Sequence, residues 1–418
     1  MILKTKSFSK YLNLLLIFLF PTQLAIHFWP DFSLIFGIRV DYLAPTIYLT
    51  DILFMALFIP WVIRNWGKFL QDIKKAKFLL IIFLTLVLLN LVFSSQLPLS
   101  AIKWLKVLEL VLLGIYINVR KDIFTQKNIS IVLFSSLTFV SLVGILQFVR
   151  GQTLGSLLYF VGERSFSIFT PGIALVNILG KNYLRAYSTF PHPNALAGFI
   201  GALLLFLFPS IVKQKNLLIK IALLLVALTF VLTFSLSSFV GIVICSLIYY
   251  FSKCQTLIKK IPNFIIVLFF IVSLVFSYLA GPVLKTSSQF SKSTTERLEL
   301  ADVSVKVFSN HWLVGTGLNT FIPNEVKFAD REKDIWLLQP VHNIYLLILT
   351  ETGVLGMLLL YILLSKLLAT ATRQPKSNIY LAILFIFITS LFDHYWFTSQ
   401  QNLLLLPLLF GISFREKN

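Results

Sequence analysis

The chain has 418 residues, of which 57% are hydrophobic and only 13% are charged, and its formal net charge is +19. A soluble domain carries about 45–50% apolar and about 25% charged residues, so soluble globular and disordered chains are excluded. In a protein with many membrane spans, excess Lys and Arg mark cytoplasmic loops rather than a nucleic-acid partner. Two cysteines, Cys245 and Cys254, are too few for a disulfide framework or a four-ligand metal site.

Twelve apolar stretches predict an all-α, polytopic membrane protein, because a helix that crosses a bilayer needs roughly 20 apolar residues. In chain order they run near 11–29, 45–63, 78–95, 100–119, 129–149, 194–212, 217–234, 236–252, 261–281, 342–365, 377–393 and 400–414. No small-residue cleavage pattern follows the first stretch, so we expect a retained span. Residues 1–418 are interpreted as a single integral membrane domain.

The positions of the basic residues predict the orientation of these spans. When the spans alternate from an inside N-terminus, more than half of the lysines and arginines fall on short inside segments, as the positive-inside rule expects. We therefore predict a multi-pass protein of the cytoplasmic membrane with both termini in the cytoplasm.

This topology leaves two long outer loops, residues 150–193 and 282–341. In the first, the apolar run 157–160 predicts a short helix in the membrane interface or folded back into the protein. In the second, Ser293 and Glu296 have the spacing of a capping box. Leu298, Ala301, Val305 and Phe308 follow at helical intervals. We expect an amphipathic helix along the outer membrane surface, apolar face down.

Histidines and charged residues gather toward the outer side of this topology. All five histidines fall there: His27, His192, His311, His342 and His394. Ionisable residues inside spans usually face a cavity or a partner, and the candidates are Asp51, Lys103, Lys106, Glu109, Glu351 and Asp393. Lys103, Lys106 and Glu109 are three residues apart on one helix face. This spacing fits a structural ion pair or a basic wall for an anionic headgroup.

Three clusters are candidates for a functional site. In the first, Arg185 precedes the run His192-Pro193-Asn194, where a capped helix N-terminus beside an arginine suits a phosphate group. The structural alternative is a capped span entrance with a surface arginine. The second cluster is Glu296-Arg297 at the start of the loop helix, and its structural alternative is a solvated charge pair.

The third cluster begins with His342-Asn343 and runs on to Glu351. A neutral imidazole at the membrane surface could take a proton from a hydroxyl, or His342 could simply be a histidine at a helix entrance.

Other chemistries have little support in the sequence. A Walker-type phosphate loop, a His-Glu-x-x-His zinc helix and an Asp-x-Asp pair are all missing. The alternating charges over residues 330–334 fit a solvated loop better than a cation site. We therefore expect no metal and no cofactor, and a reaction on the outer face that needs no ATP.

These motifs, taken in order, resemble the O-antigen ligase and O-antigen polymerase family. The likeness comes from Arg185 with the His-Pro-Asn run, the Gly315-x-Gly317 turn after a loop helix, and His342-Asn343-x-Tyr345 with Glu351-x-Gly353-x-x-Gly356. Asp393-His394-Tyr395 is similar to the end of that family's sequences. The resemblance spans about residues 180–410. One departure is Leu236, which stands where the family often has an arginine; Lys103, Lys106 or Arg164 are candidates to replace its charge.

The resemblance implies transfer of a glycan from a polyprenyl pyrophosphate carrier to a hydroxyl of a glycan or lipid acceptor. Arg185 and Arg297 would bind the pyrophosphate, and His342 would be the base. We predict that eight further residues contact substrate: His192, Asn194, Asn343, Glu351, Lys103, Lys106, Asp393 and His394. The alternatives are a transporter or flippase of lipid-linked polysaccharide precursors and a structural membrane protein. Transporters, however, usually show repeated halves and broken helices at the midplane.

Overall fold

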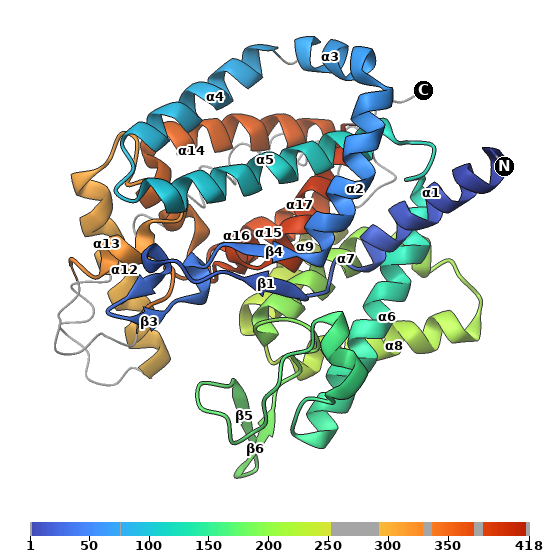
Figure 1. Cartoon of the computed structure of the whole chain (residues 1–418). Coiled ribbons are helices and arrows are strands. Elements are labelled where there is room, and N and C mark those ends of the chain that lie inside the picture. The colour runs from blue at the N-terminus through green and yellow to red at the C-terminus, as the bar shows by residue number, and fades with distance from the viewer. Residues whose placement is uncertain (1, 76, 252–291, 329–336, 372–378, 415–418) are drawn as a thin grey trace.

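The computed structural model describes residues 2–75, 77–251, 292–328, 337–371 and 379–414. Helices dominate these residues (Figure 1). They are α1 (Ile2–Phe18), α2 (Leu49–Arg64), α3 (Trp66–Lys75), α4 (Lys77–Val92), α5 (Leu97–Val119), α6 (Gln126–Arg150), α7 (Pro193–Ile211), α8 (Leu217–Leu232), α9 (Leu236–Phe251), α12 (Lys292–Asn310), α13 (Phe321–Glu325), α14 (Ile344–Ala371), α15 (Ile379–Ser390), α16 (Tyr395–Thr398) and α17 (Gln400–Ser413).

The apolar helices are those of a multi-pass membrane protein. Within the described residues, three are long and apolar enough to cross a membrane: Gln126–Arg150, Pro193–Ile211 and Ile344–Ser365. Shorter apolar helices are Phe8–Phe18, Leu80–Val92, Leu217–Leu232, Leu236–Tyr250 and Ile379–Ser390. The predicted count of twelve spans is not confirmed, and the predicted span 261–281 lies outside the described residues.

The first predicted span is displaced toward the N-terminus. The sequence predicts a helix over 11–29, but α1 ends at Phe18 and a turn follows through Pro21. Proline has no N–H and cannot continue the helical hydrogen-bond ladder. Beyond this turn the chain is extended, and β1 (Ala25–His27) pairs with β4 (Thr46–Tyr48).

The all-α prediction is therefore incomplete, because the described loops contain three short antiparallel strand pairs. Besides β1–β4, β2 (Leu34–Ile35) pairs with β3 (Ile38–Arg39), and β5 (Leu175–Ile178) pairs with β6 (Lys181–Leu184). Short 3-10 helices, Asp31–Ser33, Asp41–Leu43 and Ser156–Val161, lie in the same loops. Loop backbone groups need hydrogen-bond partners, and local pairing supplies them.

Two close helix pairs form the centre of the bundle. In α17, a Cβ at Gly411 would lie 2.6 Å from the carbonyl oxygen of Gly114 in α5. In α7, Gly201 lies directly against the ring of Phe385 from α15. Small residues let helix backbones approach closely, which is how membrane helices gain packing energy. The start of α7 also lies beside the start of α17, where Asn402 Nδ2 donates to the carbonyl of Ala195 at 3.0 Å.

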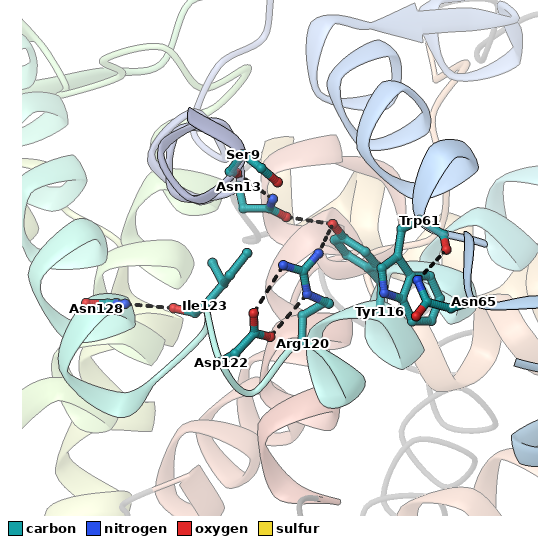
Figure 2. A network of polar contacts seen from close by, with 9 residues as sticks. All are labelled: Ser9, Asn13, Trp61, Asn65, Tyr116, Arg120, Asp122, Ile123 and Asn128. Carbon is teal, nitrogen blue, oxygen red and sulfur yellow. Dashed lines mark hydrogen bonds and ion pairs between the residues drawn. The ribbon is translucent and has the colours of Figure 1, made fainter. Parts of the chain in front are cut away.

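A polar network ties α1 to α5 (Figure 2). The Tyr116 hydroxyl donates to Asn13 Oδ1 at 2.8 Å, and the Arg120 guanidinium donates to the Tyr116 hydroxyl at 3.4 Å. Arg120 also pairs with Asp122 at 3.1 Å, in the turn before α6. These bonds satisfy the polar groups at the end of α5 and fix the entrance of α6.

The amphipathic helix predicted in the second loop exists as α12, but its apolar face does not lie free for a membrane surface. Leu298 and Ala301 are buried in a cluster with Phe321 of α13 and Leu346 and Leu347 of α14. The expectation of a helix that rests its apolar face on the bilayer was wrong on this point, because that face packs on α13 and α14. Figure 1 shows α12 and α13 at the end of the molecule opposite the start of α1.

The Gly315–Thr316–Gly317 turn fits into a kink of α14. Gly353 in the kink has φ 64°, a conformation that glycine adopts most easily. There the N–H groups of Val354 and Leu355 donate to the carbonyls of Trp312 and Leu313, at 2.9 and 3.2 Å. Thr316 and Gly317 in turn donate to the carbonyls of Thr350 and Glu351. The turn thereby completes backbone bonds that the kink interrupts.

Candidate active site

A pocket of about 1060 Å³ opens among α2, α5, α7, α12, α17 and the loops that join them. All but two of the predicted site residues line it: Lys103, Lys106, Arg185, His192, Asn194, Arg297, His342, Asp393 and His394. They come from five separate parts of the chain. The structure thus brings the three predicted clusters into one cavity, while the role of each residue stays a prediction.

His342 and Asp393 form the centre of the pocket. The Nδ1 atom of His342 lies 3.5 Å from Asp393 Oδ1, and both side chains are largely buried. The other carboxylate oxygen of Asp393 accepts a hydrogen bond of 2.9 Å from Asn194 Nδ2. Oδ1 also accepts from the backbone N–H of His394, at 2.8 Å. The carboxylate is therefore held by two hydrogen bonds and faces the imidazole of His342.

Arg185 extends this chain of contacts to the C-terminal end of α8. Its Nη2 donates to Asn194 Oδ1 at 2.8 Å, and its Nε donates to the carbonyl of Thr233 at 2.6 Å. Asn194 therefore bridges Arg185 and Asp393. Two of the guanidinium nitrogens are thus anchored, which fixes the plane of the group beside the pocket.

The N-terminus of α7 lies at the same place. His192 caps it, since its Nδ1 accepts from the backbone N–H of Asn194 at 3.1 Å. Pro193 occupies the first helical position, where its missing N–H is not needed. The backbone N–H groups of Asn194, Ala195 and Leu196 already donate to His192, so it is the helix dipole at this terminus that favours an anion.

The imidazole of His394 is neutral at neutral pH. Burial lowers the pKa of His394 to about 3, although the nearby carboxylate of Asp393 opposes the shift. Its Nδ1 lies 2.8 Å from the Thr398 hydroxyl, and its ring centroid is 5.0 Å from that of His342. The arginines and lysines that line the pocket, rather than this histidine, therefore supply its positive charge.

Arg297 of α12 also lines the pocket, together with Glu296. Arg164 lines it from the loop after the 3-10 helix Ser156–Val161 and donates to the carbonyl of Pro191 at 3.5 Å. Leu236, at the start of α9, is 78% exposed. Thr233 nearby accepts from Arg185, so this segment supports Arg185 even though it carries no arginine of its own.

The two lysines of α5 occupy a different wall. Lys106 pairs with Asp51 of α2 at 2.6 Å and with Glu109 at 3.0 Å, so the predicted ion pair is present with Asp51 as a second partner. Gln400 of α17 donates to Asp51 at 2.7 Å. Lys103 donates to the carbonyl of Phe397 at 2.8 Å. Lys106 is therefore neutralised locally, whereas no ion pair involves Lys103 among the described residues.

The two remaining predicted residues, Asn343 and Glu351, do not line the pocket. Asn343 Oδ1 accepts from the backbone N–H groups of Tyr345 and Leu346 and caps α14. Glu351 accepts from the backbone N–H groups of Asn319 and Phe321. These contacts hold the helix start that carries His342 and the loop that precedes α13. Substrate contact by either residue stays a prediction, and the observed contacts are structural.

Tyr42 was not singled out in the sequence. It lies in the 3-10 helix Asp41–Leu43 and lines the pocket. Its ring makes an edge contact with His394 at 5.4 Å between centroids. It lies far from the other site residues in sequence, and no motif marks it, so composition and spacing gave no signal.

One trio has the donor set for a metal ion. The ring nitrogens of His342 and His394 and a carboxylate oxygen of Asp393 lie within 4.8 Å of one another. Two imidazoles and a carboxylate suit a transition metal. The same three groups also suit a hydrogen-bonded acid–base centre, which needs no ion.

The fold and this pocket define a class: a multi-pass helical membrane protein with arginines, imidazoles and a buried carboxylate gathered in one cavity. The family model described as O-Antigen ligase matches residues 221–361, which confirms the resemblance predicted from the motifs for this part of the chain. Arg297 and His342 lie inside the matched segment. Arg185, Asn194 and Asp393 lie outside it and reach the same pocket. No curated protein and no solved structure gives a significant match.

Proposed function

We propose that this protein transfers a glycan from a polyprenyl pyrophosphate carrier to an acceptor hydroxyl, on the outer face of the cytoplasmic membrane. The observation that carries the proposal is the chain of contacts Arg185–Asn194–Asp393–His342, with Arg297 lining the same pocket. It joins Arg185, as the anion-binding group, to His342, as the base, through the Asn194 amide and the Asp393 carboxylate. The match to the O-antigen ligase family supports the same reaction class.

The acceptor is activated by His342. Because Nδ1 of His342 faces Asp393 at 3.5 Å, its Nε2 is the nitrogen that takes the proton from the acceptor hydroxyl. Asp393 holds the ring orientation and stabilises the imidazolium that forms, as a carboxylate does beside a catalytic histidine. The freed oxygen then attacks the anomeric carbon of the donor glycan.

The leaving group is the polyprenyl pyrophosphate. As the new bond forms, the bond between the anomeric carbon and the phosphate oxygen breaks, and its electron pair leaves with the pyrophosphate. Arg185 and Arg297 offset the charge that grows on that oxygen, a contribution of the kind that preorganised donors make. The proton stays on His342 until the product leaves.

The proposed orientation follows from charge and from the position of the pocket. With both termini in the cytoplasm, the pocket end, which carries α12, α13 and the loop of residues 151–192, faces outward. Lipid-linked donors on that leaflet then reach the pocket without crossing the membrane. Under this orientation the reaction takes its driving force from the pyrophosphate bond and requires no nucleotide.

The test is the pool of polyprenyl-linked glycans in a deletion strain that carries wild-type protein or His342→Ala, Arg185→Lys or Arg297→Ala. We expect each variant to insert normally and to lose transfer. Lysine at 185 keeps the charge but cannot bond Thr233, Asn194 and a phosphate together. His311→Ala is the matched control, because His311 is exposed and does not line the pocket.

Mass spectrometry of that pool separates the alternatives. Long chains that accumulate on the outer leaflet would identify a ligase, and single repeat units there would identify a polymerase. Precursors trapped on the inner leaflet would support a flippase instead. An unchanged pool with all three variants would refute glycan transfer at this site.

A further inference from the structure

The loop between α6 and α7 exposes several apolar side chains, which no other part of the described structure covers. In the hairpin of β5 and β6, Leu179 at the tip is 99% exposed. Phe169 and Leu157 in the same loop are 87% and 80% exposed. We propose that this loop docks on the membrane, with Leu179 inserted into the leaflet at the pocket end. The partner is thus a lipid surface.

The turn itself argues that Leu179 is present for contact rather than for folding. Leu179 and Gly180 have φ of 50° and 82°, the pattern of a two-residue turn that asparagine followed by glycine prefers. A bulky residue with positive φ is strained. Leucine here costs conformational energy and gains no packing within the described residues. Burial in lipid is a gain that offsets such a cost.

The hairpin continues an exposed apolar surface of α6. The ring of Tyr183 in β6 stacks on Phe148, in the last turn of the membrane-length helix α6, with centroids 5.7 Å apart. Leu142, Leu146 and Val149 form an exposed apolar face on that helix, at spacings of four and three. Strand β6 therefore lies beside the end of this exposed apolar face, and Figure 1 shows the hairpin projecting beyond the helices near α6.

Exposed side chains of this loop and of the end of α6 are those of a membrane interface. Lys181 pairs with Ile178 beside the turn, and Arg150 ends α6; both are exposed. Tyr159 is 62% exposed in the 3-10 helix of the same loop. Basic and aromatic side chains of this kind are enriched where a bilayer meets water. This charge complements an anionic leaflet better than a second copy of a chain with net charge +19.

The base of the hairpin is rigidly joined to the pocket. Leu184 is fully buried with Phe166 and Tyr187, and the next residue is Arg185. The Arg185 N–H donates to the carbonyl of Ala174, and the Ala174 N–H donates to the Tyr187 hydroxyl at 2.6 Å. Ala174 also lines the pocket. Docking of the tip would therefore fix the height of this pocket wall relative to the lipid headgroups.

The test measures the depth of residue 179 by electron paramagnetic resonance. A nitroxide label replaces Leu179 in a full-length background with Cys245→Ser and Cys254→Ser, in liposomes of phosphatidylethanolamine and phosphatidylglycerol. Labels at Leu146 and at the exposed Ser309 of α12 give the lipid and water references. We expect the label at 179 to collide with dissolved oxygen more than with a water-soluble nickel chelate, as the label at 146 does.

Two results would overturn the proposal. One is a label at 179 that is as accessible to the nickel chelate as the label at 309. The other is a label shielded from both reagents with dipolar broadening between labels, which would mean that a second copy covers the tip. None of these outcomes depends on whether the chain transfers glycans, so failure here is distinct from failure of the proposed function.

A second variant separates docking from folding. Leu179→Asn suits the turn better than leucine, so the hairpin should be at least as stable. Its side chain is polar and should not insert. If docking positions the pocket wall, transfer by this variant should fall several-fold in liposomes and stay unchanged in detergent micelles. Equal activity in both would contradict a positional role for the docked tip.

Discussion

Replacement of Asp393 by asparagine tests the central contact of the proposed site. Asparagine has the shape of aspartate but no charge, and one of its two polar atoms is a donor. Asp393 accepts hydrogen bonds from Asn194 and from the His394 backbone and faces His342 at 3.5 Å. An amide at this position must turn an N–H₂ group toward one of these donors. We expect the geometry around Arg185 to loosen as well, because Asn194 bridges the two residues.

The size of the effect follows from the distance between the groups. Two unit charges 3.5 Å apart interact by about 4.7 kcal/mol at an effective dielectric constant near 20. The amide dipole of the variant retains part of this attraction. The remaining loss is about 3–4 kcal/mol in the transition state, or a rate about 10²–10³-fold lower. Binding of the donor should change far less than the rate, because the imidazolium forms only during the reaction.

The assay is single-turnover transfer by purified protein in liposomes, with a lipid-linked donor and a measured pH profile. Asp31→Asn serves as the control, because Asp31 is an exposed carboxylate that does not line the pocket. A D393N rate within about threefold of the wild-type rate would refute the assignment of His342 as a base oriented by Asp393. So would a loss that appears wholly as weaker donor binding.

Two further predictions concern stability. Gly353→Ala should destabilise the fold by about 2–4 kcal/mol, because φ is 64° there and the new Cβ would meet the backbone of Leu313. Gly37→Ala has a similar φ and open space around it, so equal shifts in thermal denaturation would contradict the steric argument. Burial lowers the pKa of His394 from the ordinary histidine value of 6.5 to about 3 in the folded protein, so the neutral form is favoured by folding. That stabilisation is present above pH 6.5 and is lost as pH falls toward 3, at about 1.4 kcal/mol per pH unit. In denaturant titrations, the free energy of unfolding of His394→Asn should therefore fall less steeply with acid than that of the wild type. An unchanged slope would count against a buried neutral imidazole.

The sequence alone determined the class of protein and most of its helices. Predicted spans at 129–149 and 194–212 correspond to α6 and α7, at Gln126–Arg150 and Pro193–Ile211. This agreement has a local cause. The length of an apolar stretch determines the length of its helix, and Pro193 marks the start of α7. The site motifs were also visible, since an arginine, a histidine and a His-Pro-Asn run are unusual near apolar stretches. The family match within residues 221–361 agrees with those motifs.

The tertiary structure decided which of these residues meet. Sequence spacing grouped Asn343 and Glu351 with His342, but their side chains bond backbone N–H groups outside the pocket. The bridge from Asn194 to Asp393 joins residues 199 positions apart, and no local rule predicts such a pair. The packing of the apolar face of α12 on α13 and α14 is likewise a contact between distant segments. Periodicity states that a face must be buried, and only the packing of distant segments determines what buries it.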